Sequence, residues 1–294
     1  MFGVGVGELF LVAVVCGGLL VPAVIVTVVR FAASRNDEAG RPPGVVEAMR
    51  HGRATSAAAT VGFVVALLVG AVSSLVADSG RGLAFTPLVA SFVALCCLGL
   101  GELLGRRGRS PLRTTALNAR TARDVATGGW LRGGTLAVAG LAGVALAAGV
   151  SADRLRGRVI AKDLVGAARW GFPGWETLAP QLAGLVVVVV TWVLAVRVVV
   201  LRPTVADADV EVDNALRRAS AARVTRAALA GVLLAVGVDL LRAGSWMAQV
   251  LERSDGSAAG VALLGGVLAL VAPLLLLLPS VRLPRAAALV GAGA

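Results

Sequence analysis

The chain contains few of the residues on which most catalytic centres depend. Its 294 residues include one histidine, one lysine, three cysteines and no tyrosine. His51 alone cannot complete a histidine-based zinc site or pair with a serine inside a membrane bundle, and no H-E-x-x-H motif occurs. Lys162 lies between apolar stretches, so a retinal protein's Schiff base has no lysine inside a membrane helix. We therefore expect no catalytic activity and no cofactor.

The three cysteines also indicate no special chemistry. Cys16, Cys96 and Cys97 lack the spacing of zinc ligands, and the adjacent Cys96 and Cys97 are poorly placed to bridge each other. All three fall in apolar stretches, which is typical of small buried side chains. The glycine-rich pieces at 3–7 and 99–101 precede no strand–turn–helix pattern, so nucleotide binding is not expected either.

Charged residues are scarce too, and long apolar stretches take their place. Charged residues make up 15% of the chain and hydrophobic residues 57%, with a mean hydropathy of +0.87. A water-soluble protein of this length could not bury so much leucine and valine, so a bilayer must cover it. A helix needs about 20 apolar residues to cross about 30 Å of hydrocarbon. Seven stretches meet or approach this length: 9–29, 57–75, 88–104, 135–150, 182–201, 227–241 and 258–278.

These stretches predict an all-α, multi-pass protein of the cell (inner) membrane, with seven transmembrane helices in a single domain over residues 1–294. No basic residue precedes the first apolar stretch and no small-residue cleavage site follows it, so we expect this helix to be retained. With the N-terminus outside, twenty lysines and arginines fall on the cytoplasmic side and eight on the outer side. The positive-inside rule therefore predicts an outer N-terminus and a cytoplasmic C-terminus.

The net charge of +11 does not indicate nucleic-acid binding. The arginines lie in short segments between apolar stretches, and no basic stripe is interleaved with aromatic residues. Their arrangement favours anionic lipid headgroups as the partner.

One outer segment departs from the positive-inside pattern. Residues 154–170 carry five basic residues, while Leu155, Val159, Ile160 and Leu164 recur at near-helical spacing. This pattern predicts an amphipathic helix on the outer membrane surface. The alternative is an ordinary exposed loop.

Three polar arms resemble one another, and each leads into an apolar stretch on the cytoplasmic side. They span 47–53, 118–123 and 214–218 and precede the second, fourth and sixth stretches. Asp213 and Arg217 form an i,i+4 pair, which indicates that the last arm continues as helix into the membrane. Six arginines of these arms are candidates for contact with lipid or a cytoplasmic protein partner: Arg50, Arg53, Arg120, Arg123, Arg217 and Arg218.

The same three stretches carry small residues at every fourth position. Small residues let membrane helices approach closely, whereas apolar bulk drives no association in lipid. We therefore expect stretches two, four and six to form the centre of the bundle, with three hairpins of one orientation following the first helix. A chance pattern of an alanine- and glycine-rich composition is the alternative. The ladders include Gly62 and Gly70 in the second stretch, Gly143 in the fourth and Gly231 in the sixth.

Few ionisable residues lie within or beside the apolar stretches, and none is near the middle of one. Such residues are costly in a membrane and are therefore candidates for function. Arg197 can extend its charged end to the headgroups, and Asp239 can pair with Arg242. The candidates are Glu8, Glu102, Arg197, Asp239 and Arg242.

Two functions fit these features. The first is a non-enzymatic accessory or regulatory membrane subunit, whose basic arms contact anionic lipid or a cytoplasmic partner. The alternative is a small transporter or channel that uses Glu8 and Asp239 in an outward-facing cavity, with kinks at Pro22 and Pro273. The substrate, partner and oligomeric state do not follow from the sequence.

Overall fold

The computed structural model describes residues 41–76, 80–105, 175–202, 210–250, 256–272 and 274–277, together with residues 134, 140, 143 and 205. The first predicted stretch, most of the fourth and the 154–170 segment lie outside these residues, as do Glu8, Arg120 and Arg123.

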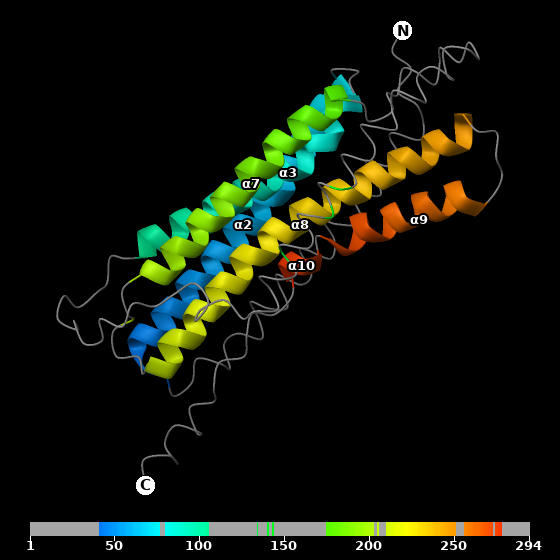
Figure 1. Ribbon diagram of the computed structural model, residues 1–294. Coiled ribbons are helices and arrows are strands. Elements are labelled where there is room, and N and C mark those ends of the chain that lie inside the picture. Colours follow the sequence, from blue (N-terminus) through cyan, green and yellow to red (C-terminus); the bar gives the residue numbers. More distant parts are fainter. Residues whose placement is uncertain are drawn as a thin grey trace.

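The described residues are helical and include no strand (Figure 1). Five helices are long and apolar enough to cross a membrane. They contain the second, third, fifth and sixth predicted stretches and most of the seventh, so the all-helical membrane class is confirmed. The helices are α2 (Pro43–Val76), α3 (Gly80–Leu104), α7 (Trp175–Leu201), α8 (Val210–Val250) and α9 (Gly256–Val271), followed by the single turn α10 (Leu274–Leu277).

Helix α8 begins at Val210, just before the polar arm at 214–218, and continues without a break through the sixth apolar stretch, as its sequence predicts. Its 41 residues are about 60 Å long, twice the thickness of the hydrocarbon layer. The last membrane helix does break at the predicted place, because α9 ends at Val271 and α10 begins at Leu274, on either side of Pro273.

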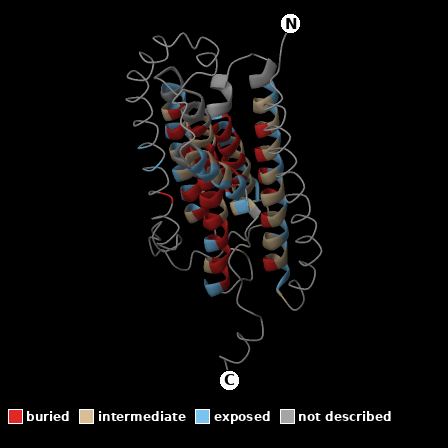
Figure 2. Ribbon diagram, turned by 90° about the vertical axis from the view of Figure 1, so that its right-hand side faces the viewer, coloured by how far each residue is buried: buried red, intermediate tan, exposed pale blue. Residues whose placement is uncertain are grey.

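Helix α3 lies between its neighbours, with α2, α7 and α8 all packed against it. Helix α9 packs on α8, and α10 contacts both. Helix α8 is the most enclosed of the five spans. In its most apolar 18 residues, 72% are buried, against 18% to 39% in the corresponding parts of the other four. In Figure 2 the buried residues gather on the faces that the helices turn toward one another. The outward faces carry valine and leucine, as helices that contact acyl chains do.

The prediction that the second and sixth stretches pack on each other is wrong. Helices α2 and α8 make only a narrow contact, and α3 separates them over most of their length. The small residues do mark the close approaches, but their partners are on α3. Gly62 lies against Val93 and Cys97, and Gly231 against Ser91. The small residues at every fourth position predicted which helix faces are in close contact. They did not predict which helix each face contacts.

Helices α8 and α9 approach each other closely enough for their backbones to be in contact. A side chain at Gly237 would meet the backbone of Ala269 and Gly265, and one at Gly265 would meet the backbone of Leu241 and Gly237. The two glycines therefore allow backbone-to-backbone contact, which is the form of association that lipid permits.

We expect Gly265→Leu to lower the free energy of unfolding by about 1–3 kcal/mol or more, because its side chain would have to displace backbone atoms. Gly260→Leu is the control on the same helix, since Gly260 has no described atom within 4 Å of an added Cβ. Thermal unfolding of the two variants in detergent compares them directly. Equal melting temperatures would contradict the backbone-to-backbone contact between α8 and α9.

Candidate functional site

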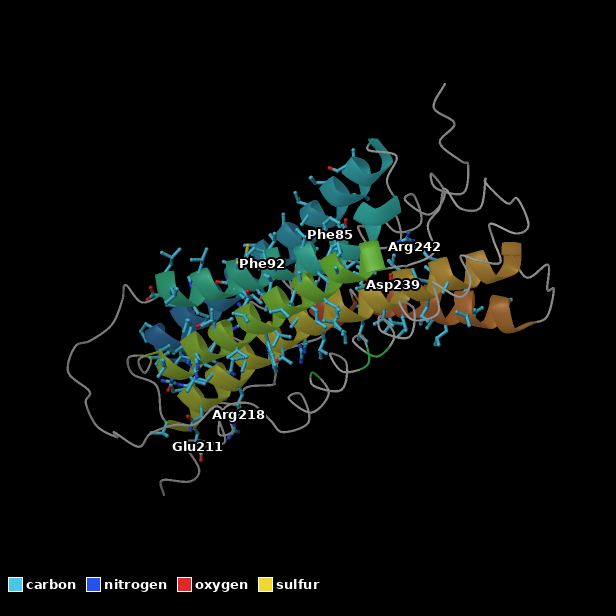
Figure 3. All side chains as sticks on the ribbon, turned by 45° about the horizontal axis from the view of Figure 1, so that its top comes forward. Phe85, Phe92, Glu211, Arg218, Asp239 and Arg242 are labelled. Atoms are coloured by element: carbon cyan, nitrogen blue, oxygen red, sulfur yellow. The ribbon has the colours of Figure 1, made fainter. Side chains whose placement is uncertain are left out.

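The described polar side chains between the helices gather mainly at two opposite ends of the bundle (Figure 3). Glu211 and Arg218 lie at the start of α8, and Asp239 and Arg242 lie further along the same helix, beside the start of α7. We call the first the arm end, because it holds the polar arms at the start of α2 and of α8. About 24 Å of helix separates Arg223 from Asp239, a distance comparable to the thickness of a hydrocarbon layer.

The arms of α2 and α8 are folded against each other. Val45 of α2 and Val212 and Leu216 of α8 form a small core that is separate from the main one. Ala48 and Met49 pack against its edge. The arms are therefore a structured extension of the bundle, and their outer sides face away from this core.

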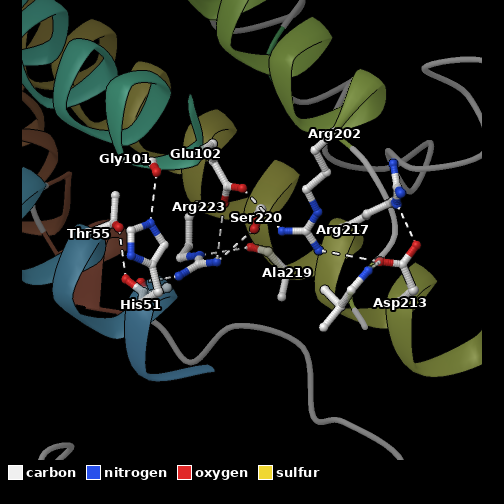
Figure 4. A network of polar contacts seen from close by, with 12 residues as sticks. His51, Thr55, Gly101, Glu102, Arg202, Asp213, Arg217, Ala219, Ser220 and Arg223 are labelled. Atoms are coloured by element: carbon white, nitrogen blue, oxygen red, sulfur yellow. Dashed lines mark hydrogen bonds and ion pairs between the residues drawn. The ribbon is translucent and has the colours of Figure 1, made fainter. Parts of the chain in front are cut away.

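Arg223 connects the arm end of α8 to α2. Its Nη1 donates to the carbonyl oxygen of Gly52 and, at 3.1 Å, to Ser56 Oγ. Its Nη2 donates to Ser220 Oγ at 2.8 Å, as Figure 4 shows. A Cβ on residue 52 would lie 2.8 Å from the guanidinium, so the absence of a side chain at Gly52 allows this approach.

Glu102 of α3 is shared between two arginines. Arg202, just after α7, donates from Nη1 to Glu102 Oε2 at 3.1 Å, and Arg223 Nη2 lies 3.9 Å from Oε1. The carboxylate is only 11% exposed. The negative charge of Glu102 on α3 therefore interacts with a positive charge of α8 and with one at the end of α7, all at the arm end.

The predicted pair between Asp213 and Arg217 is confirmed, with Arg217 Nε 2.8 Å from Asp213 Oδ2. Arg217 Nη1 also donates to the carbonyl oxygen of Val200 at 2.7 Å, in the last turn of α7. Arg217 is 2% exposed, so the prediction that it contacts lipid or a partner as part of an exposed arm is wrong. The arm is an inward-facing helix at this position, whereas Arg218 is exposed.

His51 connects α2 to α3. Its Nε2 donates to the carbonyl oxygen of Gly101 at 2.8 Å, which requires that this nitrogen carries the proton. Thr55 donates to the carbonyl oxygen of His51 at 2.8 Å. No pattern in the sequence predicted this contact.

At the opposite end, a carboxylate of α8 is buried against α7. Asp239 is 4% exposed, and Gln181 Nε2 donates to both of its oxygens at 2.9 Å. The positive charge of Arg242, one turn further along α8, also acts on this carboxylate. The sequence identified Asp239 and Arg242 but missed Gln181, because nothing along the chain relates α7 to α8.

The other predicted arginines lie on outer surfaces where they are described. Arg197 is exposed on α7, as expected for a side chain that reaches the headgroups. Arg50 is exposed and Arg53 is half-buried on α2.

Between the two ends, the described interior is apolar and closely packed. A pocket between α7 and α8, lined by Val188, Trp192, Thr225 and Val232 among others, has a volume of about 10 Å³, enough for about one water. Trp192 Nε1 donates to Thr225 Oγ1 at 3.2 Å beside it. Among the described residues, no three histidine, cysteine or acidic side chains come together to hold a metal ion.

Comparison with known proteins gives no match: no family model, no curated protein and no solved structure is similar to this chain.

We expect Gln181→Leu to destabilise the protein by about 1–3 kcal/mol, because it leaves the buried Asp239 carboxylate without its donor. The double variant Gln181→Leu/Asp239→Leu should recover much of this loss, since it removes both polar groups. A thermal-unfolding double-mutant cycle in detergent measures the coupling. Additive effects of the two single variants would contradict the contact.

Proposed function

We propose that the chain is a seven-helix protein of the cell (inner) membrane, with its N-terminus outside and its C-terminus in the cytoplasm. The path of the chain supports a further membrane crossing between α3 and α7. Helix α3 ends at the arm end with Glu102, while α7 starts at the opposite end near Gln181. The intervening chain therefore runs from one end of the bundle to the other, in agreement with a membrane crossing by stretch 135–150.

The orientation follows from the arginines. The arm end holds the starts of α2 and α8 and the ends of α3 and α7, to which the arginine-rich segments of the sequence are attached. By the positive-inside rule, these arginines support a cytoplasmic location for that end.

We further propose that the protein is a non-enzymatic accessory or regulatory subunit, which binds anionic lipid or a cytoplasmic partner through its arms. The observation that carries this proposal is the pairing of the two arms around Val45, Val212 and Leu216. This core holds the arms as a defined surface on which Arg50 and Arg218 remain exposed. The closely packed described interior supports a role at this surface.

A small transporter or channel is the second candidate, and Asp239 is the observation in its favour. A buried carboxylate inside a membrane helix is a candidate for proton or ion coupling. If this candidate is correct, Asp239→Asn should abolish coupled flux in proteoliposomes.

The double variant Arg50→Gln/Arg218→Gln tests the arms. Each arginine near an anionic surface contributes about 1 kcal/mol, so loss of both should weaken lipid or partner association roughly thirtyfold. The measurement is the amount of anionic lipid and of partner protein that copurifies from native membranes.

The matched control is Glu47→Gln/Glu211→Gln, which removes exposed negative charges from the same two arms. This control should retain or increase the association. If the arginine variant keeps both lipid and partner at the level of the unaltered protein, the proposed function is wrong.

A further inference from the structure

Arg202 is the least satisfied of the charged side chains at the arm end. Its side chain is 9% exposed, and Nη1 donates to Glu102. Its Nε and Nη2 are buried and have no hydrogen-bond partner, a statement that holds for the part of the chain that the structure describes. Nη2 lies 3.9 Å from Asp213 Oδ1, which is an ion pair beyond hydrogen-bond distance.

The surroundings of Arg202 are electropositive. The carboxylate of Glu102 is shared with Arg223, and that of Asp213 is paired with Arg217, so three guanidinium groups face two negative charges. Among the described residues, the other acceptors of Arg223 are neutral carbonyl and hydroxyl oxygens. Arg226 is buried and adds its positive charge to the surroundings of Arg223. A buried guanidinium with two unused donors is costly, and an anion would offset that cost.

The chemistry of the missing partner follows from the donors. Nε and Nη2 lie on one edge of the guanidinium, and together they match two oxygens of a phosphate group. Arg202 directly follows α7, at the end of its apolar stretch and therefore at the level of lipid headgroups. Basic groups between membrane helices at this level bind phosphate-bearing headgroups.

We propose that Arg202 is the centre of a phosphate-binding site at the arm end, which Arg223 supports by its charge. The ligand is a phosphate group, carried either by an anionic phospholipid or by a soluble phosphate compound. The site rests on the proposed function, which brings the arm end into contact with anionic groups. It adds one specific binding position inside the bundle to the general attraction of the exposed arms. Figure 4 shows Arg202 between Glu102 and Asp213, each of which approaches one side of its guanidinium.

The test measures anion binding by the full-length protein purified in detergent. Inorganic phosphate and short-chain phosphatidylglycerol are titrated separately, and the dissociation constant comes from the shift in melting temperature. Short-chain phosphatidylcholine is the uncharged-lipid control. Binding of both anions through Arg202 identifies a general phosphate site, and binding of phosphatidylglycerol alone identifies a lipid site.

Two variants should change the affinity in opposite directions. Arg202→Lys keeps the charge but loses the paired donors, so anion binding should weaken about tenfold or more. Glu102→Gln removes the competing carboxylate, so anion binding should tighten. Arg197→Gln changes an exposed arginine of α7, the helix that Arg202 follows, and should leave the affinity unchanged.

The opposite signs separate binding from folding. If both Arg202→Lys and Glu102→Gln weaken binding, the network is only structural and the proposal is overturned. Failure of both anions to bind, or an affinity that Arg202→Lys leaves unchanged, also overturns it. If Arg202→Lys does not fold, Glu102→Gln decides alone, and an unchanged affinity then rejects the site.

The arm variant separates this site from the proposed function. If Arg50→Gln/Arg218→Gln loses lipid from native membranes while Arg202→Lys has normal affinity, the arms function without this site. If only Arg202→Lys loses affinity, the phosphate site remains and the proposed role of the arms fails.

Discussion

The absence of water in the hydrocarbon layer is the constraint on which the rest of this structure depends. A polar group between membrane helices cannot turn to solvent, so another helix must supply its partner. Arg223 reaches from α8 to the backbone of α2, and Gln181 reaches from α7 to Asp239. These contacts also fix which helices are neighbours. Polar side chains at the two ends of the bundle therefore specify an arrangement that apolar surfaces alone would leave undetermined.

Between those ends, close packing takes over the role that the hydrophobic effect has in water. Lipid chains are as apolar as leucine, so helices associate only where their surfaces fit closely. Gly231 lies against Ser91 and the backbone of Pro87, and Gly237 lies against the backbone of α9. Ser91 adds a hydrogen bond to the carbonyl oxygen of Ala227 at 2.9 Å. Helix α8 is thus held on several sides, which explains why it is the most buried of the five described spans.

The features that could be predicted from the sequence are those that depend on neighbouring residues. The length of each apolar stretch predicted the described membrane helices, and the i,i+4 spacing predicted the contact of Asp213 with Arg217. Gly62 and Gly231 were correctly identified as contact positions, but their partner helix was not, because a small residue permits close approach to any surface. Arg217 was misplaced on an exposed arm for a similar reason, since its burial depends on the end of α7.

Contacts between distant parts of the chain explain what the sequence did not show. Arg202, Arg223 and Gln181 find their partners 100, 171 and 58 residues away, and no local pattern encodes such distances. One usable signal was present: Asp213, Arg217 and Ser220 share one helical face at a spacing of four and three residues. A polar face that continues into an apolar helix is typical of residues that bond to neighbouring helices.

The most direct measurement of the central claim is the environment of the outward-facing valines in lipid. Nitroxide labels at Val65, Val190 and Val267, placed one at a time after replacement of the native cysteines, report collisions with oxygen and with a water-soluble nickel complex. All three residues are exposed on the described bundle. The account predicts high oxygen and low nickel accessibility at each, with low values of both at the buried Ala230. High nickel accessibility at the three valines would place water where the account requires lipid, and would contradict it.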